Sequence, residues 1–494
     1  MATAQNSAPA AATADPRRWL ALAVITIAQL MVVLDSSIVN IALPSLEHDL
    51  SITEANRQWV VTAYLLTFGG FLLLGGRIAD YMGRKKTFVF GLIGFAGASA
   101  LGGAANNLEV LLAARALQGL FAALMAPAAL SLISITFTEP AERAKAFGVY
   151  GGASGGGAAL GLILGGVLTE YASWRWCFLV NIPIALAAAF FATRVVRESR
   201  ATGDARYDLP GAITATAGLT ALVYGFSKAS EDGWAAGSTL GFIVTGLVLL
   251  VAFVTIEVRS THPLLPMRVL LHRDRGGSFL GSMFAVSGMI GMFLLMTFYF
   301  QGTLHYSALK SGFAFLPFSV GIITAASLAG KFLPRFGPRP LIFGGFLAAS
   351  LGLAWMAQID SGSSYFVQIF PAEILMSLGM GFAFVPLSST ALTGVSEHDA
   401  GVASAALNAT QQVGGSLGTA LLNTIATTAT TNYIASHGTS ASAIVDAQVH
   451  GYATGFGIAA VSVGIAAVFG ALLIRSIDRD ESESSEEYAL GVVA

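Results

Sequence analysis

The chain alternates fourteen apolar stretches, each long enough to cross a bilayer, with short polar loops. About 20 apolar residues in a helix cover the roughly 30 Å hydrocarbon core of a membrane. Composition agrees, because 55% of the residues are hydrophobic, only 11% are charged and the mean hydropathy is +0.71. The sequence therefore predicts an all-α membrane protein with 14 transmembrane helices. They are expected to begin near Leu20, Gln58, Thr87, Leu108, Ala144, Arg175, Pro210, Thr239, Gly277, Ser311, Pro340, Tyr365, Ser404 and Tyr452.

The first stretch, Leu20 to Ala42, contains Asp35 in its interior. A carboxylate inside the hydrocarbon core is costly enough to mark a functional site by default. This position points to transport across the membrane.

The positions of the basic residues orient the spans. With the N-terminus inside, 21 of the 26 Lys and Arg residues face the cytoplasm, and both termini are cytoplasmic. We expect a multi-pass protein of the bacterial inner membrane. The histidines lie in or beside loops and Cys177 is the single cysteine, so no metal site is predicted.

A loop pattern repeats along the chain. Residues 76–86 (GRIADYMGRKK) follow the second span, and a similar glycine and basic pattern at 330–340 (GKFLPRFGPRP) follows the tenth. Two six-helix halves with two additional helices between them explain a repeat after eight spans. The predicted domains are a disordered cytoplasmic tail (1–18), an N-terminal six-helix bundle (19–200), two additional helices with a cytoplasmic linker (201–275), a C-terminal six-helix bundle (276–476) and an acidic cytoplasmic tail (477–494).

The first of these loops resembles the cytoplasmic signature loop of the major facilitator superfamily. Further segments resemble its fourteen-span drug:proton antiporter branch: 34–44 (LDSSIVNIALP), 115–119 (RALQG), 173–183 (SWRWCFLVNIP), 299–301 (YFQ) and 408–418. The resemblance implies the major facilitator fold and a rocker-switch exporter that works as a monomer in membrane lipid. Its partners would be a small amphipathic substrate and the proton, with the proton gradient as energy source, no cofactor and no nucleic acid.

The signature loop also makes physical sense by itself. Gly76 and Gly83 permit close approach and a tight turn, while Arg84 and Lys85 anchor the loop at anionic headgroups. Asp80 is either a solvated loop acid or, as the resemblance implies, a latch between the two bundles in the outward-open state.

The fifth span is unusually rich in glycine, and Gly161, Gly165 and Gly166 are predicted to let two helices pack closely and slide. The related antiporter motif carries a proline that is absent here, which weakens the inference of antiport. Two Gly-x-Ser-x-Gly patterns follow no strand, and no phosphate-binding glycine-lysine motif is present, so we predict neither a hydrolase nor an ATPase.

Three charged residues lie at one predicted depth. Asp35, Arg115 and Glu373 each fall about seven or eight residues from the outer end of a span, or roughly 10 to 12 Å below the outer interface. We expect Asp35 to pair with Arg115 inside the N-terminal bundle and these residues to couple transport to protons. Glu373 is either a second proton or cation site facing the same cavity or a snorkelling acid.

Aromatic and amide residues of two later spans are the predicted cavity walls. Most aromatic residues in such a chain face lipid or pack between helices, but those beside a polar side chain are better candidates for a bulky ligand. The predicted substrate-binding residues are Tyr299, Phe300, Gln301, Gln411 and Gln412.

These features predict proton-coupled efflux of amphipathic drugs or antibiotics. The alternatives are a dedicated exporter of an endogenous metabolite or natural product, and a receptor that transports nothing. The Ala, Ser and Thr-rich segment from about Thr427 to His450 is expected to be an outer loop without chemistry.

Overall fold

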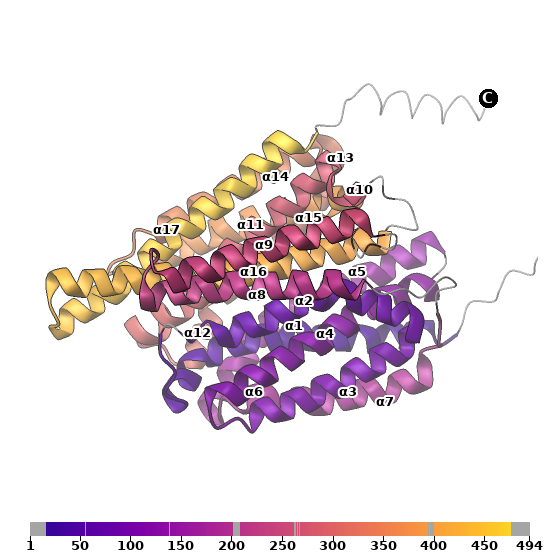
Figure 1. Cartoon of the computed structure of the whole chain (residues 1–494), viewed down its shortest axis with the longest axis horizontal. Coiled ribbons are helices and arrows are strands. Elements are labelled where there is room, and N and C mark those ends of the chain that lie inside the picture. Colours follow the sequence, from indigo (N-terminus) through magenta and orange to yellow (C-terminus); the bar gives the residue numbers. More distant parts are fainter. Residues whose placement is uncertain are drawn as a thin grey trace, which may run out of the picture.

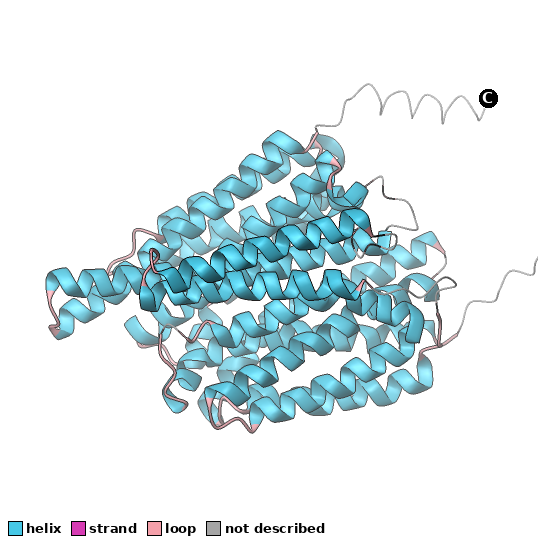
Figure 2. Ribbon diagram, viewed as in Figure 1, coloured by secondary structure: helices cyan, strands magenta, loops and turns pink. Residues whose placement is uncertain are grey.

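A computed structural model describes residues 16–54, 56–137, 139–200, 208–260, 263, 265, 267–393, 395 and 400–475. The predicted acidic tail and most of the predicted N-terminal tail lie outside this part of the chain. The described residues form helices joined by turns and loops, with no strand (Figure 2). Thirteen helical segments are long and apolar enough to cross a membrane.

The first half of the chain contributes α1 (Arg18–Asp49), α2 (Trp59–Met82), α3 (Arg84–Gly103), α4 (Leu108–Thr136), α5 (Pro140–Tyr171), α6 (Trp176–Leu179) and α7 (Asn181–Val195). They are followed by α8 (Leu209–Asp232), α9 (Gly237–Arg259) and α10 (Met267–Leu270). The second half contains α11 (Arg273–Phe298), η1 (Tyr299–Thr303), α12 (Ala308–Ala314), α13 (Leu316–Phe336), α14 (Pro338–Met356), η2 (Tyr365–Ile369), α15 (Phe370–Leu392), α16 (Ala400–His437) and α17 (Ala441–Leu473).

The two halves repeat one packing scheme. In the first, α1 packs on α5, α2 on α4, and α3 on α4 and α7; in the second, α11 packs on α16, α13 on α15, and α14 on α15 and α17. Figure 1 shows the first half in indigo and purple on one side and the later helices in orange and yellow on the other. Helix α8 contacts α2, α9 and α16, so it lies along the seam between the halves.

Both repeated segments, expected as loops, are helical except for one glycine with positive φ that separates two helices. Gly83 follows α2 with φ of 108°, and Gly337 follows α13 with φ of 75°. These values suit glycine because a side chain is strained in this region of backbone space. Both copies of the predicted repeat therefore contain a glycine with positive φ between two helices.

The helix starts agree with the predicted spans to within four residues, except at the last span. The predicted thirteenth span lies in α16, which is long enough to cross a membrane but richer in Ser, Thr, Asn and Gln than the others. The expected outer loop from Thr427 to His450 is wrong: α16 continues to His437 and α17 begins at Ala441. Figure 1 shows this helical hairpin projecting beyond the other helices.

Candidate functional site

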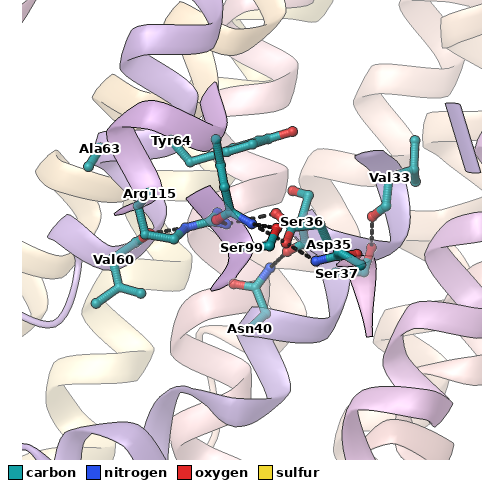
Figure 3. A network of polar contacts seen from close by, with 12 residues as sticks. Val33, Asp35, Ser36, Ser37, Asn40, Val60, Ala63, Tyr64, Ser99 and Arg115 are labelled. Atoms are coloured by element: carbon teal, nitrogen blue, oxygen red, sulfur yellow. Dashed lines mark hydrogen bonds and ion pairs between the residues drawn. The ribbon is translucent and has the colours of Figure 1, made fainter. Parts of the chain in front are cut away.

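A buried ion pair joins α1 and α4 inside the first half. Arg115 donates from Nη1 to Asp35 Oδ2 at 2.7 Å, and the two side chains are 1% and 0% exposed. The predicted pairing of these two residues is thus present in the structure (Figure 3).

Three further polar side chains complete the cluster around Asp35. Gln118 Nε2 donates to Asp35 Oδ1 at 2.9 Å, and Asn181 Nδ2 donates to the same oxygen at 2.7 Å. Gln118 Oε1 in turn accepts from Arg115 at 2.8 Å, and its Nε2 also lies 2.9 Å from Ser99 Oγ. The carboxylate of Asp35 therefore accepts from three side chains on α4 and α7.

Gln118, Asn181 and Ser99 were not predicted as site residues. Gln118 lies three positions after Arg115, so both residues occupy one face of α4. That spacing was the available signal in the sequence. Asn181 begins α7 within the segment 173–183 that resembles the antiporter branch, but neither its position nor that of Ser99 on α3 predicts contact with Asp35.

Arg115 is also held by α2. Its Nε donates to the Val60 carbonyl at 2.9 Å, and its guanidinium lies 4.4 Å from the centre of the Tyr64 ring (Figure 3). Helices α2 and α4 approach closely because Gly119 faces Thr67 and the Tyr64 carbonyl, where a Cβ atom would collide. A glycine in α4 thereby brings the arginine within reach of the α2 backbone.

This geometry links protonation to side-chain position. A proton on Asp35 would compete with one of its three donors and leave the Arg115 charge without its counterion. An unpaired buried charge is strongly unfavourable, typically by about 3 to 5 kcal/mol when one partner is removed. Protonation of Asp35 is therefore expected to require movement of Arg115 or of the helices that carry the cluster.

Glu373 lies apart from this cluster, in the first turn of α15 in the other half. It is 1% exposed, and neither carboxyl oxygen has a hydrogen-bond partner in the described part of the chain. The Tyr365 side chain is a neighbour, but its hydroxyl donates to the Ala314 carbonyl at 2.8 Å. Burial of a carboxyl group without a hydrogen-bond partner is costly, and the role of Glu373 as a proton or cation site stays a prediction.

The predicted aromatic wall is covered in this conformation. Tyr299 and Phe300 are both fully buried in η1, where Phe300 packs against Tyr306, Phe315 and Tyr365. These two rings contact protein here, so their role in binding substrate stays a prediction.

Three predicted amide residues lie on elements that join the two halves. Gln301 Nε2 donates to the Ile41 carbonyl of α1 at 2.9 Å. Gln412 faces Gly69 of α2, and a Cβ atom built on that glycine would lie 2.8 Å from the Gln412 Cβ. Gln411 is its half-buried neighbour on α16. The three amides therefore lie on elements that contact the other half, and substrate contact by them remains a prediction.

An apolar groove of about 550 Å³ opens between α2, α8 and α9. None of the predicted site residues lines it. Its walls are formed by Phe71, Ile213, Thr216, Ala217, Thr220, Ala221, Tyr224 and Phe242. This position is compatible with contact to lipid and gives no support for the predicted cavity.

Asp80 and Lys85 of the signature loop bond within their own half, whereas Arg77 donates to the Pro263 carbonyl after α9 at 3.2 Å. Asp80 Oδ1 accepts from Arg84 at 2.9 Å, and Lys85 Nζ donates to the Thr193 carbonyl at 2.8 Å. Glu198, which the sequence did not single out, accepts from the backbone N–H groups of Lys85 and Lys86 at the start of α3. A carboxylate at a helix N-terminus stabilises the helix, because the helix dipole places partial positive charge there. The Asp80 latch between bundles therefore stays a prediction for the outward-open state.

The glycines of this loop differ in how tightly they are packed. A Cβ atom at Gly83 would lie 2.6 Å from Glu198 Oε1, whereas one at Gly76 would make an ordinary 3.5 Å contact with Pro127. The absence of a side chain at Gly83 therefore lets the Glu198 carboxylate lie close to the start of α3.

The three predicted glycines of α5 face two different neighbours. A Cβ atom would lie 2.8 Å from Ser37 Cβ at Gly161 and 2.9 Å from the Ile38 carbonyl oxygen at Gly165, both on α1. At Gly166 it would lie 2.6 Å from Leu309 Cα, in α12 of the other half. Close helix packing is confirmed, and sliding at these positions stays a prediction.

Comparison with known proteins gives a consistent result. A family profile described as "Major Facilitator Superfamily" matches residues 25–419. The puromycin resistance protein pur8 of Streptomyces alboniger is 51% identical over 467 residues, which cover 94% of this chain and 91% of that protein. The cephamycin export protein CmcT of Amycolatopsis lactamdurans is 38% identical over 409 residues, covering 82% and 84%. A crystal structure of a bacterial homologue of the human lysosomal transporter Spinster matches the fold with a TM-score of 0.68 at 16% identity, covering 93% and 98%.

Proposed function

Because the chain belongs to the major facilitator superfamily, and is therefore a transporter rather than an enzyme, we propose that it exports amphipathic antibiotics in exchange for protons. Its many spans and bacterial relatives identify a small-molecule transporter of the inner membrane. The observation that supports proton exchange is the buried cluster of Asp35, Arg115, Gln118 and Asn181, where a carboxyl group can gain or lose a proton only together with a rearrangement.

The proposed cycle couples this rearrangement to transport. A substrate binds from the cytoplasm while Asp35 is charged and paired with Arg115. After the switch to the outward-open state, a proton from outside neutralises Asp35 and favours release of the substrate. Return of the proton to the cytoplasm restores the ion pair and resets the transporter. Glu373 is proposed as a second carboxyl site in the opposite half.

The substrate class follows from the relatives. Proteins similar over most of this chain are named for resistance to puromycin and for export of cephamycin. We propose antibiotics as the substrates and puromycin as the first compound to test, since that relative shares 51% of the aligned residues.

The decisive experiment measures puromycin accumulation in cells that lack their own pumps. Cells producing this protein should accumulate less puromycin than cells with an empty vector, and a proton uncoupler should remove the difference. Lower accumulation that persists after the gradient is dissipated would contradict proton coupling, and equal accumulation in both strains would contradict export of this compound.

A dedicated exporter of one natural product is the second candidate. It is favoured by relatives whose names each contain a single antibiotic. Resistance to a panel of unrelated amphipathic drugs distinguishes the two candidate functions. A multidrug pump protects cells against several chemical classes, whereas a dedicated exporter protects them against one.

A further inference from the structure

A buried arginine connects the two halves at their outer ends, meaning the end that carries the α1–α2 and α11–α12 connections. Arg57, just before α2, is 3% exposed. Its Nε donates to Asn423 Oδ1 of α16 at 3.0 Å, and its guanidinium lies 3.7 Å from the centre of the Phe298 ring of α11. The carboxylate of Glu47, in its own half, is 3.8 Å away.

Asn423 completes this contact with its other amide atom. Its Nδ2 donates to the Glu54 carbonyl at 2.9 Å. One fully buried side chain of the second half therefore makes two hydrogen bonds to the α1–α2 connection. Hydrogen bonds from a charged donor are among the stronger side-chain contacts, and loss of Asn423 would leave the buried Nε of Arg57 without this acceptor.

Two neighbouring contacts close the same end. Gln301 of η1 donates to the Ile41 carbonyl of α1, and Glu170 at the end of α5 accepts from the Leu309 N–H of α12 at 3.0 Å. Helices α5 and α12 also meet where Gly312 packs against the Leu162 backbone. The outer ends of the halves are therefore sealed by contacts from three separate elements.

The inner parts of α5 and α13 differ from this outer end, although α2 packs on α11 and α16 at its own inner end. At 100° per residue, Gly148, Gly151 and Gly152 lie on the face of α5 that carries Gly166, which touches α12 near the outer end. A Cβ atom at any of these three inner glycines would meet nothing within 4 Å, and the same is true of Gly330 on α13. Along α5, contact with the other half is therefore present at the outer glycine, Gly166, and absent at these inner glycines.

We infer that Arg57 and Asn423 form an outer gate, whose rupture allows the halves to separate on the outside. Two charged side chains of this seal bond across the seam, Arg57 and Glu170; Glu170 is exposed, whereas Arg57 is buried against Asn423 and Phe298. Opening must hydrate the Arg57 charge. The gate is thus a positioning element that sets the balance between inward-open and outward-open states, beyond the residues proposed for proton exchange.

Distances between spin labels test this gate without measuring transport. In a Cys177→Ala background, one cysteine pair at Tyr171 and Phe366 reports the outer ends, and another pair at Val149 and Phe336 reports the inner ends; all four native side chains are exposed. The full chain is reconstituted in nanodiscs without substrate or gradient. Arg57→Ala and Asn423→Leu should each raise the ratio of outward-open to inward-open molecules by about tenfold, through loss of one charged hydrogen bond.

Arg175→Ala is the matched control, because Arg175 pairs with Asp49 at 2.7 Å at the same end but within one half. Its distance distributions should match those of the parent protein. The gate is refuted if Asn423→Leu, purified as a monodisperse helical protein, keeps the parental distributions, or if Arg175→Ala shifts them equally. Because these distances are measured at rest, failure of the gate is distinct from failure of the proposed export function.

Discussion

Asn181 donates to Asp35 Oδ1 at 2.7 Å, which ties the first residue of α7 to the middle of α1. Arg115 and Gln118 reach the same carboxylate from α4. Asp35 is therefore held by two helices that are distant in sequence, and any change in its charge acts on both. This is the physical basis for a proton-controlled rearrangement in the first half.

Asp35→Asn should abolish proton-driven export while the protein stays in the membrane, because the amide keeps the size of the carboxyl group but cannot exchange a proton. We expect at least a tenfold loss of gradient-driven puromycin uptake into everted vesicles, roughly the effect of removing a coupling contact worth 1.4 kcal/mol or more. Asp49→Asn is the control, since Asp49 is a half-exposed outer carboxyl paired with Arg175. Normal uptake by the Asp35 variant would exclude a coupling role.

The spans and the central ion pair were predictable from sequence for a simple reason. Hydropathy reports the thickness of the hydrocarbon core, and counting residues from a span end gives the depth of a charged side chain at 1.5 Å per residue. Equal depth of Asp35 and Arg115 was enough to predict their pairing. Depth does not give the direction around a helix, so it could not separate the two alternatives for Glu373, a second site facing the same cavity or a snorkelling acid; the structure places this side chain in α15 at 1% exposure.

Other features depend on information that hydropathy does not contain. The hairpin at the end of α16 and start of α17 is polar and lies where a loop was expected, because hydropathy detects membrane burial and not helix formation in water. Arg57 directly precedes the expected start of the second span, where a solvated loop charge is the ordinary expectation, yet it is buried between the halves. Its burial depends on how the two halves are arranged relative to each other, and hydropathy does not indicate that arrangement.

Arg115→Ala should be more damaging than Arg115→Lys. Alanine leaves the buried Asp35 carboxylate without its counterion, which typically costs about 3 to 5 kcal/mol. Lysine keeps the charge but lacks the planar fork that reaches both Asp35 and the Val60 carbonyl. Thermal unfolding in detergent and vesicle transport should rank the variants in this order.

The double variant Asp35→Asn with Arg115→Ala tests the coupling directly. It should be more stable than the sum of the two single effects indicates, by about 0.5 to 3 kcal/mol, because neither charge is left alone. Strictly additive effects would show that the two residues act independently.

Gly165→Ala should destabilise the contact between α1 and α5. The added methyl group would lie 2.9 Å from the Ile38 carbonyl oxygen, and overpacking of this kind costs about 1 to 3 kcal/mol. Gly152→Ala on the same helix is the control, since nothing lies within 4 Å of its Cβ position and alanine favours helix by up to about 1 kcal/mol. The melting temperature should fall for the first variant and hold or rise for the second. Equal shifts would contradict close packing at Gly165.

Glu373→Gln is expected to impair export of cationic compounds more than export of neutral ones. The carboxyl group is buried and lacks a hydrogen-bond partner among the described residues, so a bound cation would provide the partner that the protein does not. Glutamine keeps the size and removes the charge. A neutral ligand needs only apolar walls and loses nothing. Resistance should fall by about tenfold for an ethidium-like cation, the effect of one charged contact, and stay near the parental value for a neutral antibiotic.

The control for this variant is Glu109→Gln, because Glu109 occupies the first turn of α4, as Glu373 does in α15, but is exposed. It should leave both resistances unchanged. Folding of Glu373→Gln is checked by its amount in the membrane and its melting temperature, which should stay close to the parental values because no hydrogen bond is removed. An equal loss for cation and neutral drug, or for neither, would assign Glu373 to helix packing alone, and a loss confined to the cation would establish the second carboxyl as a site for positive charge.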